Sequence, residues 1–246
     1  MTAAADSPWA GRSVVLVHSP LVGPSTWRRV ADELVARGAS VAVPDLTAVA
    51  SAPAPMWPVY VEGAVAAARG LPGPVTVLGH SGAAVFLPII ADRLSIHAGP
   101  SVFVDALVPP AFGERRPSDE FLATLDRVAD GELLRPWLDW WPADLVETVL
   151  LPDPGHRAEV AADLPRLPRR FYDEPVPMPP GWSGAPCAYL RLSEGYDDDH
   201  AEAASRGWPT AELDRTHLGI VTDPVGVVDA VGSLLVRLDR LAPLER

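Results

Sequence analysis

Short continuous apolar runs alternate along the chain with segments whose apolar residues recur every three or four positions. The runs are bounded by Gly, Pro or Asp, a pattern that predicts parallel strands buried on both faces. They cover residues 13–17, 41–43, 75–78, 101–105, 187–192 and 210–213. The intervening segments predict helices over 25–37, 59–69, a stretch after Gly82, 199–206 and 223–241, with Ser25 as a helix N-cap. This alternation predicts an α/β fold with a mostly parallel, doubly wound sheet.

The pattern breaks between Pro109 and Pro186. This segment has many prolines, no strand-like run and several short helical patterns, including one over 133–141. We therefore expect residues 1–108 and 186–246 to form the α/β core. Residues 109–185 are expected to form a helical cap over the edge of the sheet.

Ser81 stands at the sharpest predicted bend of the core. An apolar run rich in β-branched residues ends at Gly79, and an Ala/Val/Phe-rich segment follows Gly82, so a buried strand must turn directly into a helix. Small residues flank the bend at Gly79 and Ala83, which allows a turn that exposes the apex hydroxyl above the strand. Because free N–H groups at a helix start favour developing negative charge, Ser81 is a candidate nucleophile.

Composition limits which partners the protein can bind and which cellular compartment it is expected in. The net charge of -12 and the scattered arginines argue against nucleic acid and acidic membrane surfaces. No apolar run approaches the roughly 20 residues of a transmembrane helix, and residues 1–8 lack the pattern of a signal peptide, so a cytoplasmic protein is expected. The single cysteine, Cys187, lies within an apolar run and is expected to be buried packing.

These motifs together resemble the α/β-hydrolase superfamily. The resemblance rests on Val-Val-Leu-Val-His-Ser at 14–19, Gly-His-Ser-Gly-Ala at 79–83, and His217 in the loop before the last helix, and it covers the chain apart from the cap. It implies that His217 is the general base that takes the Ser81 proton. It implies no metal and no organic cofactor.

The acid that would orient His217 has two candidates. The usual family position, after the run ending at Leu192, offers Asp197, but that residue heads an exposed acidic run typical of a helix start. Asp105 closes the strand that follows the Ser81 helix, as in some members of the superfamily, and a carboxylate at a buried strand end needs a partner. We favour Asp105.

The expected oxyanion hole departs from the superfamily pattern. One donor is the N–H of Gly82, and the second position is occupied by Pro20, which has no N–H. The alternatives are the N–H of Leu21 after a shift of the loop, the Ser19 hydroxyl, or a hole with one donor, and we expect Leu21 to be the second donor. Loss of a donor would cost about 3 kcal/mol of transition-state stabilisation, which favours a slow or specialised acyl transfer.

Tryptophans of the predicted cap suggest the character of the substrate. Trp137, Trp141 and Trp182 are expected to wall a binding site for a small, flat acyl group. The sequence thus predicts serine-dependent hydrolysis or transfer of a small-molecule or carrier-bound ester or thioester, as in natural-product pathways. A cofactor-free lyase or isomerase and a non-catalytic binder are the alternatives. The sequence leaves the oligomeric state open.

Overall fold

The structure is a computed structural model of the chain and describes residues 7–241. Six parallel strands form its central sheet in the order β10-β9-β4-β3-β1-β2. The strands are β1 (Ser13–Val17), β2 (Ser40–Ala42), β3 (Val75–His80), β4 (Ala98–Val104), β9 (Cys187–Arg191) and β10 (Thr210–Glu212). The predicted α/β fold with a parallel sheet is confirmed, and each of the six apolar runs contributes one strand to it.

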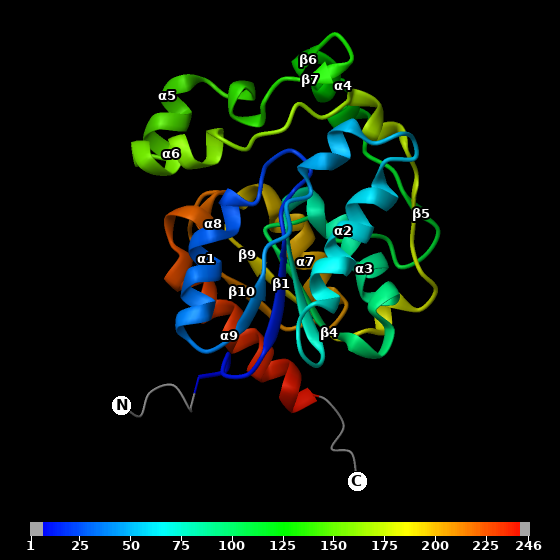
Figure 1. The fold of residues 1–246 in the computed structure, drawn as a ribbon, viewed down its shortest axis with the longest axis vertical. Coiled ribbons are helices and arrows are strands. Elements are labelled where there is room, and N and C mark those ends of the chain that lie inside the picture. The colour runs from blue at the N-terminus through cyan, green and yellow to red at the C-terminus, as the bar shows by residue number, and fades with distance from the viewer. Residues whose placement is uncertain (1–6, 242–246) are drawn as a thin grey trace.

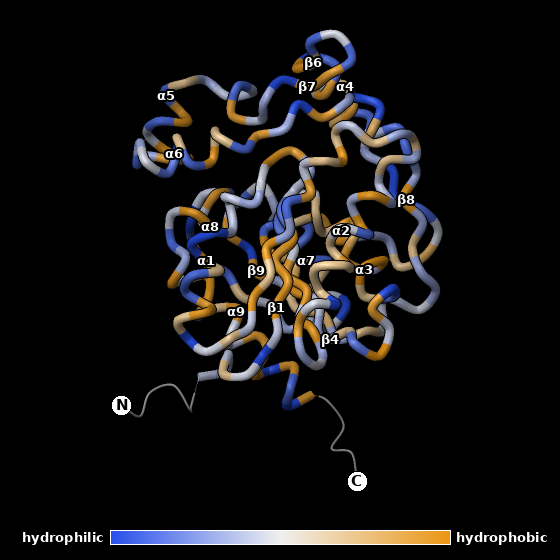
Figure 2. The backbone as a smooth tube through the Cα atoms, viewed as in Figure 1, coloured by the Kyte–Doolittle hydropathy of each residue, from blue (hydrophilic) through white to orange (hydrophobic). Residues whose placement is uncertain are grey.

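Helices cover both faces of this sheet (Figure 1). One face packs against α1 (Ser25–Ala36), α8 (Gly219–Thr222) and α9 (Pro224–Leu241), and the other against α2 (Trp57–Arg69), α3 (Leu87–Leu94) and α7 (Asp197–Ser205). Along β1, Val14 and Leu16 belong to the first of these cores, whereas Val15 and Val17 belong to the second. Because successive strand residues point to opposite faces, a strand covered on both faces must be apolar throughout. Figure 2 shows this hydrophobic centre along the strands.

The chain between β4 and β9 holds the predicted cap. Its regular elements are β5 (Glu114–Arg115), α4 (Asp119–Val128), β6 (Ala129–Asp130), β7 (Leu133–Leu134), α5 (Ala143–Leu145), α6 (Pro154–Ala161) and β8 (Val176–Pro177). Of these, α4, α5, α6, β6 and β7 lie beyond the end of β1 opposite to the N-terminus, and β5 lies to the side of α2 and α3 (Figure 1). Strand β5 pairs with β8, and β6 pairs with β7, both antiparallel. The expectation that this segment contains no strand was wrong, because two-residue strands are too short to leave an apolar run.

The helix expected over residues 133–141 is also absent. Leu133 and Leu134 belong to β7, and only Trp137–Trp140 turn, as a 3-10 helix. Pro136 separates the two parts in an extended conformation, with φ -48° and ψ 139°. A proline inside a helix removes one hydrogen bond and collides with the preceding turn, so the apolar spacing could not be realised as one α-helix.

The prediction that the Ser25 side chain caps α1 was wrong. The N-cap residue is Pro24, and the backbone N–H and hydroxyl of Ser25 donate to the carboxylate of Asp163, at 2.8 and 2.7 Å. Asp163 comes from the cap, 138 residues further along the chain. A carboxylate at the start of a helix satisfies free N–H groups and interacts favourably with the helix dipole. This contact fastens the cap to the loop that follows β1.

Cys187 is buried as expected, and burial raises the pKa of its thiol to about 12. Among the helices in residues 7–241, none is both long and apolar enough to cross a bilayer. The expectation about a signal peptide concerns residues 1–8, of which 1–6 lie outside the described part of the chain.

Candidate active site

Ser81 sits on a strained turn at the end of β3. Its φ is 57°, a left-handed conformation that costs a residue other than glycine about 1–3 kcal/mol. The chain enters a 3-10 helix at Ser81–Phe86 and continues as α3. Gly79 permits this tight passage, because a Cβ there would lie 2.8 Å from Cδ2 of Leu87. The expected bend therefore forms, and it presents the Ser81 side chain to a cavity above the sheet.

Asp105 and His217 meet at the neighbouring strand end. Nδ1 of His217 lies 2.7 Å from Oδ2 of Asp105, whose side chain is fully buried. Oδ2 also accepts from the Ser193 hydroxyl at 2.6 Å, and Oδ1 accepts the backbone N–H groups of Leu192 and Ser193, each at 2.8 Å. Burial raises the pKa of Asp105, but the hydrogen bonds and charge of His217 and the bonds from Ser193 outweigh it, so the pKa lies below its ordinary value. Asp105 is thus an ionised carboxylate that fixes the proton of His217 on Nδ1.

Asp197 serves elsewhere. Its carboxylate lies 3.2 Å from Nε of Arg191, its side chain is 61% exposed, and it begins α7. Of the two candidate acids, Asp105 is therefore the one that contacts His217, and Asp197 lies at a helix start on the surface.

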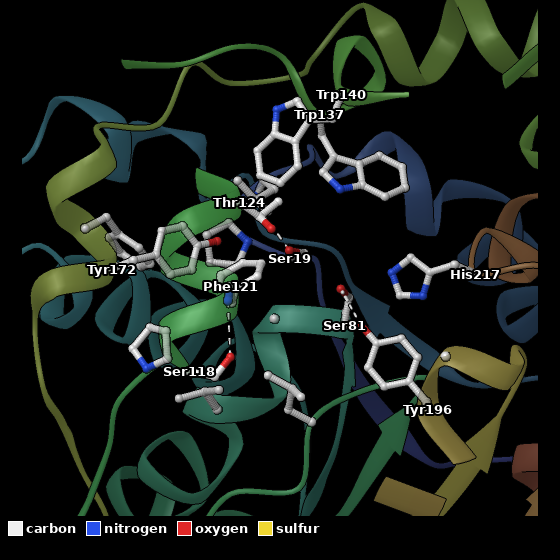
Figure 3. A pocket seen from close by; sticks show the side chains of 18 of the residues that line it. Ser19, Ser81, Ser118, Phe121, Thr124, Trp137, Trp140, Tyr172, Tyr196 and His217 are labelled. Atoms are coloured by element: carbon white, nitrogen blue, oxygen red, sulfur yellow. Dashed lines mark hydrogen bonds between the residues drawn. The ribbon is translucent and has the colours of Figure 1, made fainter. Parts of the chain in front are cut away.

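Aromatic rings enclose the His217 imidazole. Tyr196 stacks on it with ring centroids 5.2 Å apart and planes at 11°, and Trp137 lies at 5.9 Å. The Tyr196 hydroxyl also lies 3.4 Å from Oγ of Ser81, as Figure 3 shows. Burial raises the pKa of Tyr196 to about 12, so its hydroxyl keeps its proton at neutral pH. Among the residues described, Tyr196 is the hydrogen-bond partner of Ser81, and His217 lines the same cavity.

The His80 ring packs against the His217 ring. Its ring lies 4.4 Å from that of His217, and its Nε2 lies 2.9 Å from the His217 carbonyl oxygen, to which it donates. Trp27 packs edge-on against the other side. Burial lowers the pKa of His80 to about 3, so the ring is neutral and adds no second positive charge beside His217.

The loop after β1 is held by His18. Its Nε2 accepts the Leu46 N–H at 3.0 Å, its Nδ1 lies 2.9 Å from the Ser19 carbonyl, and the Tyr60 hydroxyl donates to the His18 carbonyl. Burial lowers the pKa of His18, which keeps the ring neutral for both contacts. The loop therefore enters the site with a fixed backbone at Ser19 and Pro20.

Ser19 and Gly82 face one another across the expected oxyanion hole. A Cβ on Gly82 would lie 3.3 Å from Oγ of Ser19 and 3.7 Å from Cδ of Pro20. The Leu21 N–H, the expected second donor, points at Oγ of Ser19 at 3.4 Å. The residues expected at the hole are thus adjacent, and the Ser19 hydroxyl stands between the N–H of Leu21 and Gly82.

The cavity that contains Ser81 and His217 has a volume of about 560 Å³. Trp137, Trp140 and Trp141 form part of its wall. Trp182 does not line it, contrary to expectation: its ring packs against Phe103 and Trp208, under the guanidinium of Arg206. The left-handed Gly181 turn and the bond from Nε1 of Trp182 to the Pro110 carbonyl direct the side chain there.

Sequence reasoning missed Tyr196 and Ser193 as parts of this site. Both lie in the polar loop after β9, beside β4 in the sheet. A serine or tyrosine in such a loop has no distinctive spacing, so the signal available was only the adjacency of strand ends. In residues 7–241, no three or more His, Cys, Asp or Glu side chains are grouped so as to hold a metal ion.

The family model described as "Alpha/beta hydrolase family" matches residues 14–230, which include every residue of the site. The chain belongs to the α/β-hydrolase family. No curated protein sequence matches it significantly.

Solved structures similar to this α/β hydrolase span nearly its whole length. An extracellular α/β-hydrolase from a Paenibacillus species has a TM-score of 0.71 at 16% identity, covering 91% of this chain and 98% of its own. A pyrethroid hydrolase has a TM-score of 0.68 at 16% identity, and the match covers 96% of this chain and 100% of its own. Tomato methylketone synthase I has a TM-score of 0.69 at 13% identity, and the match covers 93% of this chain and 99% of its own. At these identities the likeness establishes the fold alone.

The two candidate acids can be separated by activity. We expect Asp105→Asn to lower kcat on any ester this α/β hydrolase turns over by about 10⁴-fold, because the amide no longer holds the proton on Nδ1 of His217. The matched control, Asp197→Asn, removes only an exposed ion pair and is expected to retain the rate within about twofold. Steady-state kinetics on a chromogenic ester measure both, and a larger loss in Asp197→Asn would contradict the assignment.

The buried His80 ring predicts an acid-sensitive fold. Its folded pKa of about 3 lies below the ordinary 6.5, so the unfolded chain binds the extra proton between these values and stability falls as pH drops through that window. The loss reaches at most about 1.4 kcal/mol per pH unit.

Urea unfolding at pH values from 7 to 4.5 tests this dependence. His80→Gln, which keeps a donor for the His217 carbonyl, is expected to flatten the fall, and His97→Gln, at an exposed position, is expected to leave it unchanged. Equal slopes in the parent and in His80→Gln would show that His80 is not the titrating group.

Proposed function

We propose that this α/β hydrolase cleaves esters or thioesters of small acyl groups through a covalent acyl-enzyme. Ser81 is the nucleophile, His217 the general base and Asp105 the residue that orients His217. The observation that carries the proposal is the 2.7 Å contact of His217 with the buried Asp105, in a cavity that also holds the strained Ser81. The similar structures of a pyrethroid hydrolase and a polyneuridine aldehyde esterase support ester cleavage.

The chemistry follows from the protonation states. With Nδ1 of His217 holding a proton toward Asp105, Nε2 is free to accept the Ser81 proton as Oγ bonds to the substrate carbonyl. For this step the Ser81 hydroxyl, which contacts the Tyr196 hydroxyl in the structure, must turn toward the imidazole. The imidazolium returns the proton to the departing alcohol or thiol, and an acyl-serine remains. Water, or a second nucleophile that accepts the acyl group, then gives its proton to His217 as it attacks the acyl carbonyl. The bond from that carbonyl to Oγ of Ser81 breaks, and the imidazolium returns the proton to Oγ.

The negative oxygen of the tetrahedral intermediate is stabilised by the Gly82 N–H and the Ser19 hydroxyl. Because the Leu21 N–H donates to Oγ of Ser19, the Ser19 hydroxyl keeps its own proton to donate, and Gly82 lies beside Oγ. A hydroxyl thus replaces the backbone donor that Pro20 lacks. The tryptophans of the cavity wall suit a flat or aromatic acyl group, as expected from the sequence.

Covalent labelling tests the proposal directly. We expect a fluorophosphonate to add once to the parent protein, at Ser81, as read by intact mass and peptide mapping. Aryl esters and aryl thioesters are expected to be turned over with an acyl-enzyme detectable after rapid acid quench. Ser81→Ala should lose both signals, and Ser205→Ala, on the exposed end of α7, should keep them.

The alternatives give different results. Turnover of an α-hydroxynitrile (cyanohydrin) to a carbonyl compound and cyanide without a trapped acyl-enzyme would indicate a lyase. Ligand binding without adduct or turnover would indicate a binding protein, and the covalent mechanism would be wrong.

Variants of the loop after β1 test the oxyanion hole. We expect Ser19→Ala to lower kcat by roughly 10²-fold or more, with a smaller change in KM, because the donor acts mainly in the transition state. In the Ser19→Ala background, Pro20→Ala restores a backbone N–H at the position where the superfamily has one, and kcat is expected to recover. Undiminished kcat in Ser19→Ala would exclude the hydroxyl from the hole.

A further inference from the structure

Arg115 has a half-buried side chain without a protein acceptor. Within residues 7–241, no hydrogen bond or ion pair to its guanidinium is found, and the other arginines without one, Arg170 and Arg240, are exposed. Every other half-buried arginine of this part of the chain donates to a carboxylate or a carbonyl: Arg12, Arg29, Arg37, Arg157, Arg169, Arg191 and Arg206. A guanidinium has five N–H donors, so leaving it partly dehydrated and unpaired is costly.

Three carboxylates that could pair with Arg115 accept hydrogen bonds from other groups instead. Glu114 accepts from Arg116 at 2.6 Å, and Asp199, whose charge attracts Arg115, accepts the Val108 N–H at 2.7 Å. Glu174 accepts backbone N–H groups at the start of α2. Burial lowers the pKa of Arg115 from its ordinary value, yet a guanidinium remains charged at neutral pH. The positive charge is therefore available to a ligand.

Arg115 lines the same cavity as Ser81. It lies on β5, opposite Val176 of β8, and the wall around it is largely apolar, with Phe121, Phe171 and Val176. Of the charged residues that line this cavity, Glu174 is bound by backbone N–H groups at the start of α2, whereas Arg115 has no protein acceptor and lies beside an apolar surface. A planar guanidinium matches the two oxygens of a carboxylate, and such charge-assisted pairs strengthen where water is excluded.

We propose that Arg115 binds a carboxylate of the substrate, so that the natural ester or thioester carries a negatively charged carboxylate separated from the scissile bond by an apolar spacer. This inference rests on the proposed function for the reaction and deepens it to a substrate class. The carboxylate belongs to the acyl part or to the leaving part, and both place the same group against the same guanidinium.

Paired substrates distinguish these two placements. One arm compares 4-nitrophenyl monoesters of succinate, adipate and suberate with the neutral butyrate, hexanoate and octanoate esters. The other arm compares 4-carboxyphenyl butyrate with phenyl butyrate. We expect the parent protein to favour the carboxylate member in one arm, and Arg115→Met to lower the ratio of the two kcat/KM values at least tenfold. Arg115→Lys, which keeps the charge without the fork, should lower it less.

Arg170→Met is the matched control, because Arg170 is also unpaired but exposed, and the ratio is expected to stay unchanged. Equal ratios in the parent and in Arg115→Met in both arms would overturn the carboxylate assignment while leaving ester cleavage intact.

Binding gives a readout that does not depend on turnover. In a Ser81→Ala background, monomethyl suberate and 4-butyryloxybenzoate are titrated by calorimetry, with methyl octanoate and phenyl butyrate as neutral counterparts. We expect Arg115→Met to weaken binding of one carboxylate ligand at least tenfold and of its neutral counterpart by much less. Failure of the labelling experiment together with this selective loss would reject the proposed chemistry but keep the carboxylate site. Equal weakening of both members would reject the site.

Discussion

The buried carboxylate of Asp105 is the interaction on which the site depends. An ionised group removed from water is tolerated only when hydrogen bonds replace its hydration. Its four partners come from two segments of the chain: the loop after β9, with Leu192 and Ser193, and the loop that carries His217. Asp105 itself ends β4, next to β3 and β9 in the sheet. One charge therefore ties together the ends of β4 and β9 and the loop after β10, which is the rigidity that the proposed proton transfer at Ser81 would demand.

Two residues at this edge have strained backbones. Ser81 and Asp105 both adopt positive φ, at 57° and 44°, where side chains other than glycine are disfavoured. Their neighbours hold them there: Asp105 N–H donates to the Leu190 carbonyl at 2.7 Å, and Gly79 allows Leu87 to pack beneath the turn at Ser81. Stability gained in the apolar layers on both sides of the sheet thus maintains conformations that the isolated segments would leave.

The sequence predicted the parallel sheet well because a strand buried on both faces must be apolar throughout, and six such runs were visible. It also indicated Ser81, at a strand end that must turn directly into a helix, and favoured Asp105 over Asp197. The resemblance to α/β hydrolases pointed to His217. It failed where contacts are made between distant segments. Asp163 replaces Ser25 as the cap of α1, and Pro136 divides a helical pattern into a strand and a 3-10 turn. Neither the unpaired state of Arg115 nor the position of Tyr196 has any local signature, because both depend on which partners the fold leaves nearby.

The bond between Asp163 and Ser25 has a consequence for how the enzyme could change. Gly23, just before α1, leaves room for Asp163, since a Cβ there would collide with its carboxylate and its carbonyl. The cap is therefore anchored at Ser25, the first residue of α1 and six residues from Ser19. Remodelling the cap for a new substrate would displace this anchor and, with it, the hydroxyl beside Gly82. Changes in the cap that alter which substrate binds would therefore also alter the rate. A cap taken from a relative would need a residue equivalent to Asp163 to leave the proposed reaction centre undisturbed.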